Sequence, residues 1–226
     1  MIENFLLFSE RCAGSHFVQY AMLENFYIDY LSSHHNKRHF FGHEDDTYTQ
    51  EEIDTTLFIC VVRDPIEWVD SYFKRLHHVP PINRKNSDCF VKNEWYSIYD
   101  DKEKNGKEIM EDRNIITKKR HKNILELRKA KHEYFLTTAQ NRFKYVYILK
   151  YEDLRDNFES EMEAIKNQFN LQQRGYEYRK IIKYKGSYNQ LYAKKPILLS
   201  PEIQQYIRDN VDKEQEAELG YFEYAT

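Results

Sequence analysis

The chain of 226 residues contains little glycine, proline or cysteine, with 6, 5 and 3 residues of each. Glycine this scarce tends to stand where the backbone needs conformational freedom, so each one marks a position of interest. Cys12, Cys60 and Cys89 are odd in number and lack the spacing of metal ligands, so the sequence predicts neither a disulfide framework nor a metal site. Because unpaired thiols are typical of reducing compartments, we expect a cytoplasmic protein.

Long hydrophobic runs are also missing. No stretch of 18 apolar residues occurs, so the sequence predicts no membrane span. The first residues, 1–4, lead directly into an apolar run and lack the basic segment and small-residue cleavage site of a signal peptide. An ectodomain or capsule enzyme separated from its anchor is the second interpretation.

An excess of positive charge is absent as well. The formal net charge is −3, whereas a general nucleic-acid binder usually carries a basic excess. We therefore expect no nucleic-acid partner. An anionic small molecule stays compatible with this charge, because a few local donors are enough to hold a phosphate.

Short apolar runs alternate with segments of helical periodicity along the chain. Strands are predicted at 5–8, 38–43, 57–62 and 145–149, and helices at 16–31, 65–76, 124–135, 158–169 and 203–211. This alternation predicts an α/β fold, a single domain over 1–226 with a central parallel sheet flanked by helices. Residues 79–118 are polar and irregular, which predicts a mobile insertion within that domain.

Polar clusters follow three of these strands, at Ser9–His16, Arg63–Ser71 and Tyr151–Leu154. Ligands of parallel sheets bind at the carboxyl ends of the strands, so these clusters direct the search for a site. In the first cluster Gly14 allows close approach of a phosphate to the backbone at a helix N-terminus, with Arg11, Ser15 and His16 as further donors. The loop is no Walker A motif, which needs two glycines and a lysine. A helix cap with Ser15 as N-cap is the alternative interpretation.

The second cluster resembles the sulfotransferases that use 3′-phosphoadenosine-5′-phosphosulfate (PAPS). That family carries an arginine at a strand end, followed by Asn/Asp-Pro, and a serine eight positions later; Arg63, Asp64-Pro65 and Ser71 match this spacing. The resemblance implies a P-loop-like architecture in which Arg63 and Ser71 hold the 3′-phosphate of the nucleotide. Structurally, Arg63 could equally be a charged strand end, and Ser71 a tolerated polar residue within a helix.

Three further segments resemble the same family. Its 5′-phosphosulfate loop reads basic residue-Ser-Gly-Thr/Ser, and Arg11-Cys12-Ala13-Gly14-Ser15-His16 is similar, with one extra residue before the glycine. Tyr151-Glu152-Asp153-Leu154 is similar to a recurrent Tyr-Glu-Asp-Leu, whose tyrosine would lie near the adenine or serve the fold. Lys185-Gly186 is similar to a C-terminal Lys-Gly that closes over the 3′-phosphate. The implied cofactor is PAPS, and its product is 3′,5′-adenosine bisphosphate.

Transfer of a sulfuryl group needs a general base, and histidine suits that role at neutral pH. In many members of the family a Lys-x-His supplies the base, and Lys37-Arg38-His39 shows that spacing. His39 is therefore the first candidate and His43, on the same face of the predicted strand, the second. Because other branches use a glutamate, Glu10 and Glu44 stay open.

The sequence therefore predicts a sulfotransferase acting on a hydroxyl or amine of a small-molecule, glycan or peptide acceptor, which no pattern identifies. One alternative is an inactive member of the same fold that binds a nucleotide or a glycan. A nucleotide kinase is less well supported because the Walker lysine is missing. A cysteine phosphatase would read Cys-x5-Arg, whereas here Arg11 precedes Cys12.

Overall fold

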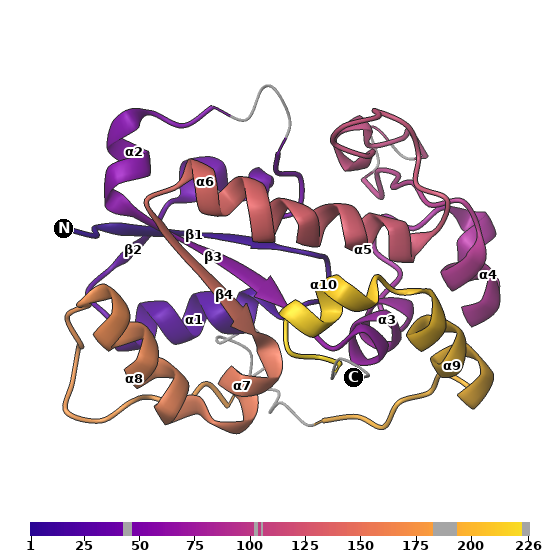
Figure 1. Ribbon diagram of the computed structural model, residues 1–226. Coiled ribbons are helices and arrows are strands. Elements are labelled where there is room, and N and C mark those ends of the chain that lie inside the picture. Colours follow the sequence, from indigo (N-terminus) through magenta and orange to yellow (C-terminus); the bar gives the residue numbers. More distant parts are fainter. Residues whose placement is uncertain (43–46, 102–103, 105, 183–193, 223–226) are drawn as a thin grey trace. The chain divides into compact units, whose positions relative to one another are not determined.

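The computed structural model describes residues 1–42, 47–101, 104, 106–182 and 194–222 (Figure 1). The chain divides into two compact units, each of which is described by itself. Unit 1 comprises Met1–His39, Asp46–Arg63 and Thr137–Pro196, and unit 2 comprises Phe40–Asp45, Asp64–Leu136 and Ile197–Thr226. The expectation of a single domain with a mobile insertion at 79–118 stays a prediction.

Unit 1 is built on a four-stranded sheet in the order β2-β1-β3-β4, in which every neighbouring pair is parallel (Figure 1). The strands are β1 (Asn4–Ser9), β2 (Asp29–Tyr30), β3 (Thr56–Val62) and β4 (Tyr145–Lys150). Every residue of β3 is buried, as expected of an apolar run in the middle of a parallel sheet. The predicted α/β fold with a central parallel sheet is confirmed.

One face of this sheet is covered by aromatic side chains. Phe58 stacks on Phe143 with ring centroids 3.7 Å apart, and Tyr48 meets both rings edge to face. Phe8, from the neighbouring strand, lies 5.7 Å from Phe58. Side chains alternate between the faces of a strand, so the adjacent residues of β1 and β3 point to the opposite face.

Helices of unit 1 flank the sheet, with α1 packed against β1 and β2. They are α1 (Ser15–Asn25), the 3-10 helix η1 (Ser32–Arg38), α2 (Gln50–Thr55), α6 (Gln140–Arg142), α7 (Tyr151–Asp156) and α8 (Phe158–Phe169). The helix predicted to run to Leu31 ends earlier, because Phe26 is extended and the chain turns into β2. Asn25 bonds back to the Ala21 carbonyl oxygen at this end.

The strand predicted at 38–43 was wrong. Residues Ser32–Arg38 form η1, His39 has helical backbone angles, and the strand next to β1 is β2 instead. Arg38 explains the difference: its buried guanidinium donates to Gln19 and to the Tyr30 hydroxyl, which holds this segment against α1 and β2. A shared strand face for His39 and His43 is thereby lost, and His43 lies outside the described residues.

Unit 2 consists of helices and irregular segments. Its elements are α3 (Pro65–Phe73), η2 (Pro81–Arg84), α4 (Ser87–Lys92), η3 (Met110–Asp112), α5 (Ile124–Glu133), α9 (Pro201–Asn210) and α10 (Lys213–Glu218). A π-helical turn, η4 (Tyr134–Ala139), spans the boundary with unit 1. α3 begins as its sequence predicts, with Asp64 accepting from the backbone of Ile66 and Glu67 ahead of Pro65. In the part of the chain that the structure describes, no helix is long and apolar enough to cross a membrane.

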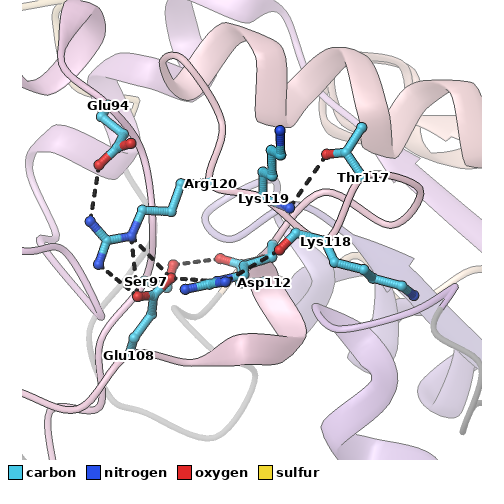
Figure 2. Close-up of polar contacts among 9 residues, drawn as sticks. Glu94, Ser97, Glu108, Asp112, Thr117, Lys118, Lys119 and Arg120 are labelled. Carbon is cyan, nitrogen blue, oxygen red and sulfur yellow. Dashed lines mark hydrogen bonds and ion pairs between the residues drawn. The ribbon is translucent and has the colours of Figure 1, made fainter.

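A network of charged side chains ties the segment after α4 together (Figure 2). Arg120 contacts Glu94 at 3.0 Å and Glu108 at 2.7 Å, and Arg113 contacts Glu108 at 2.8 Å. Partial burial alone would raise the pKa of Glu108, but hydrogen bonds from Arg113 and Arg120 lower it to about 2. Glu108 therefore stays ionised through the physiological pH range.

Lys131 and Arg128 of α5 each form a buried ion pair within unit 2. Lys131 of α5 donates to Asp112 at 2.9 Å, and Asp112 also accepts from the Ser97 hydroxyl. Arg128, one turn earlier on α5, makes a two-pronged contact with Glu216 of α10. All five side chains are at most 7% exposed. Pairing offsets the free energy that is lost when these charges leave water, which would be large for an isolated buried charge.

Candidate functional site

The loop between β1 and α1 has an irregular backbone that leads into the first turn of the helix. Cys12 and Gly14 have positive φ angles of 64° and 105°, and Gly14 is the N-cap of α1 without a side-chain cap. The alternative in which Ser15 caps the helix was wrong, because Ser15 is already the first helical residue. The backbone N–H groups of a first helical turn lack intrahelical partners and point toward any bound anion.

The side chains of this loop differ in exposure. Glu10, Arg11 and Ser15 are buried, whereas Cys12 is half-buried and His16 is exposed. The first turn of α1 contains no acidic residue that would repel an anion. The loop thus combines a helix N-terminus and the cationic side chain of Arg11, both of which favour an anion, with the buried carboxylate of Glu10.

Arg63 connects the end of β3 to this loop. Its Nη1 donates to the Cys12 carbonyl oxygen at 3.2 Å, and its guanidinium carbon lies 4.5 Å from the centre of the Tyr151 ring. The pairing of β1 with β3 explains the contact, since parallel neighbours bring their carboxyl ends to the same edge. The structure therefore brings Arg63 to the loop.

Tyr151, which directly follows β4, contacts the same loop. It is the first residue of α7, it is buried, and its ring lies against Gly14. A Cβ atom built on Gly14 would come within 2.3 Å of Tyr151 Cδ2. Glycine is needed at this position for the tyrosine as well as for the backbone angle, a reason that no local sequence pattern shows.

His39 also reaches this edge of the sheet. Its Nδ1 lies 2.9 Å from the carbonyl oxygen of Ser9, the last residue of β1, and 3.4 Å from the Ser9 hydroxyl. A carbonyl oxygen only accepts, so Nδ1 carries a proton, and in the neutral ring the lone pair is then on Nε2. His39 thus has the tautomer that a base acting through Nε2 requires.

Lys37, its partner in the Lys-x-His pattern, is directed elsewhere. Its Nζ donates to the Thr47 carbonyl oxygen at 3.2 Å and lies 4.8 Å from the centre of the Tyr48 ring. These contacts belong to the segment before α2.

Other predicted site residues are not brought to the loop by the described part of unit 1. Ser71 lies half-buried on α3 and belongs to unit 2. Lys185, Gly186, His43 and Glu44 lie outside the described residues. Of the residues assigned to the nucleotide, unit 1 therefore groups the loop of residues 11–16, Arg63 and Tyr151.

Arg155 is a residue that the sequence interpretation missed. Its guanidinium carbon lies 5.5 Å from the centre of the Tyr151 ring, so it shares that ring with Arg63. A signal was present, because Arg155 follows Tyr151 by four positions and residues at this spacing share one face of a helix. The motif that resembles the family covers only residues 151–154 and does not include Arg155.

Metal ligands do not gather at this edge: among the described residues, no group of three or more His, Cys, Asp or Glu side chains is arranged to hold a metal ion. What the site offers is backbone donors, guanidinium groups, an aromatic ring and an imidazole. Comparisons of the chain with models of protein families, with curated proteins and with solved structures gave no match.

Proposed function

We propose that the chain is a sulfotransferase that transfers a sulfuryl group from PAPS to an acceptor hydroxyl or amine. One observation carries the proposal: Arg63 from β3 and Tyr151 from β4 both contact the loop between β1 and α1. These are the segments whose motifs resemble the family. Their contact supports a common ligand, because residues that serve one ligand must lie together.

The residues present fit such a nucleotide in their chemistry. The backbone of Gly14–His16 and the Arg11 side chain would hold the 5′-phosphosulfate, and Arg63 would hold the 3′-phosphate, to which the family resemblance also assigns Ser71 of unit 2. Bound PAPS would supply an activated sulfuryl group. The guanidinium groups would neutralise negative charge that develops during transfer, as cations do in phosphoryl transfer.

His39 is proposed as the general base. Its Nε2 would accept the proton of the acceptor, while the Nδ1 bond to the Ser9 carbonyl oxygen holds the ring in position. The acceptor is proposed to be a small molecule, a glycan or a peptide. The cytoplasm is proposed as the place of action, because three cysteines, an odd number, are typical of a reducing compartment.

A ligand-stabilisation screen tests the proposal. We expect 3′,5′-adenosine bisphosphate to raise the melting temperature more than ATP, ADP or GTP, since a ligand at ~100 times its Kd stabilises by ~2.7 kcal/mol. Transfer of labelled sulfate from PAPS then tests turnover. Stabilisation without transfer would identify an inactive nucleotide-binding protein, and stabilisation by ATP with magnesium alone would favour the kinase.

The assignment of Arg63 has its own test. Arg63→Ala should weaken 3′,5′-adenosine bisphosphate at least tenfold more than 5′-AMP, because a hydrogen bond to a charged group contributes ~1.5–3 kcal/mol. Isothermal titration of both ligands measures this ratio. Arg142→Ala, which removes an arginine that stacks on Tyr48 instead, should leave the ratio unchanged. Equal weakening of both ligands by Arg63→Ala would contradict the assignment.

A further inference from the structure

Tyr151 carries two arginines on its ring. The guanidinium carbon of Arg63 lies 4.5 Å from the ring centre and that of Arg155 lies 5.5 Å from it. The two carbons are therefore no more than about 10 Å apart, the reach of two cation–π contacts on one ring. Two like charges at this distance repel each other, so an anion near both would be favoured.

Arg155 forms an ion pair with the carboxylate of the next residue. Arg155 donates to Asp156 through Nε at 2.7 Å and through Nη2 at 2.6 Å. The arginine side chain is 11% exposed, whereas that of Asp156 is 57% exposed. The guanidinium thus sits within the fold beside Tyr151, and its counter-ion stands in solvent.

Two lysines also act on the charge of Asp156. The hydrogen bond from Arg155 lowers the pKa of the Asp156 carboxyl, and the charges of Lys194 and Lys180 lower it further. Three cations from different parts of unit 1 therefore act on one exposed carboxylate. When Asp156 releases Arg155, the exposed carboxylate regains contact with water, whereas the guanidinium, which is largely buried, needs another anion in its place.

We propose that Arg155 is a further anion-binding residue of this site, and that Asp156 occupies its guanidinium until a ligand phosphate displaces it. The inference rests on the proposed function and extends it. The displacing group is the 3′-phosphate, because Arg155 shares the Tyr151 ring with Arg63, to which that phosphate is assigned. The Asp156 carboxylate then competes with the 3′-phosphate for the Arg155 guanidinium, and this competition lowers the affinity for nucleotides that carry a second phosphate.

The test measures the ratio of the affinities for 3′,5′-adenosine bisphosphate and 5′-AMP by isothermal titration of the full chain. Arg155→Ala should reduce this ratio about tenfold, because it removes a charged donor to the second phosphate. Asp156→Asn should raise it about threefold, because the neutral amide competes less well for the guanidinium. In the Arg155→Ala background, Asp156→Asn should change the ratio little, because the group it competes for is gone.

Two control variants separate this effect from general changes in charge and packing. Arg174→Ala removes an arginine that stacks on Tyr27, which follows the C-terminal end of α1. The loop lies at the N-terminal end of this helix, which is about 16 Å long, so Arg174 is far from the loop. Asp54→Asn removes a carboxylate that pairs with Lys144, ahead of β3 and β4 at the amino end of the sheet. Neither should alter the ratio.

The outcomes distinguish the inference from the function on which it rests. If the wild type prefers the bisphosphate and Arg63→Ala removes that preference, but Arg155→Ala does not alter it, the inference is wrong and the proposed function stands. The inference is also overturned if Asp156→Asn raises the affinity ratio in the Arg155→Ala background, or if Asp54→Asn raises the ratio by the same factor. Either result would mean that the loss of any negative charge has this effect. If the wild type binds neither nucleotide, both fail.

Discussion

His39 donates its Nδ1 proton to the Ser9 carbonyl oxygen, and this bond determines what the ring can do. With Nδ1 protonated, the neutral ring has its lone pair on Nε2, from which it can accept a proton. The fixed orientation also reduces the loss of side-chain freedom on reaching the transition state. At the scale of single residues, this makes His39 the first candidate for the base.

Replacing His39 by alanine should lower kcat for sulfuryl transfer by about 10²–10⁴-fold and leave nucleotide affinity nearly intact, because a base acts in the transition state. Steady-state kinetics together with bisphosphate titration measure both effects. His34→Ala is a matched control, since that ring pairs with Glu52 of α2. An unchanged kcat for His39→Ala would move the role to His43, Glu10 or Glu44.

At the scale of elements, the strand–loop–helix unit of β1 and α1 depends on Gly14. Its backbone angle is unfavourable for residues with a Cβ, and the Tyr151 ring occupies the space that a Cβ would need. The loop therefore fixes α7 and α1 relative to each other within unit 1. This requirement holds whether or not a nucleotide is bound.

Gly14→Ala should consequently reduce the free energy of unfolding by about 1–2 kcal/mol for the backbone angle and a further ~1–3 kcal/mol for the contact with Tyr151. Gly106→Ala isolates the first part, because Gly106 has a φ of 79° and nothing within 4 Å of a built Cβ. Urea denaturation of both variants gives the difference. Equal losses would mean that the Tyr151 ring moves away at no cost.

The packing of α10 against α5 in unit 2 depends on a buried ion pair. Arg128→Leu leaves the Glu216 carboxylate buried without its guanidinium and should cost about 3–5 kcal/mol of unfolding free energy. The double variant Arg128→Leu/Glu216→Leu should recover most of that loss, because neither charge of this pair is then left buried. Chemical denaturation of the three proteins tests this. A double variant no more stable than Arg128→Leu would contradict the argument.

At the scale of the whole molecule, stability should depend on pH through His121. Its side chain is buried and burial lowers its pKa below the usual 6.5, although the charge of Asp112 opposes this. Lys131 lowers the pKa and Glu126 raises it. Since the folded state keeps the ring neutral, the unfolded chain binds the additional proton as the pH falls.

The free energy of unfolding should therefore be at its full value above pH 6.5 and decrease as the pH falls from there toward the folded-state pKa. His121→Gln should flatten this part of the profile, whereas His77→Gln, at an exposed position, should not. Thermal melts between pH 5 and 7.5 compare the three proteins. A profile for His121→Gln parallel to the wild type would assign the dependence to other groups.

Much of the sheet could be predicted from the sequence. β1, β3 and β4 fall on the apolar runs, and α3 and α9 begin at Asp64-Pro65 and Ser200-Pro201, where capping residues precede a proline. These features are local, because apolar periodicity and capping depend on residues a few positions apart. The carboxyl ends of parallel neighbours share an edge, so the meeting of Arg63 with the loop followed from the strand assignments.

By itself, then, the sequence determined the α/β fold class, the central strands and the polar residues at their ends. The tertiary structure decided which two residues pair with β1 as β2, that Arg38 ends η1 where a strand was predicted to begin, and that the Tyr151 ring contacts Gly14 and two arginines. The physical reason is the distance along the sequence over which the interactions act. Asp29–Tyr30 has no apolar run of its own and becomes a strand only because β1 offers an edge, and side chains distant in sequence acquire their contacts only when the chain has folded.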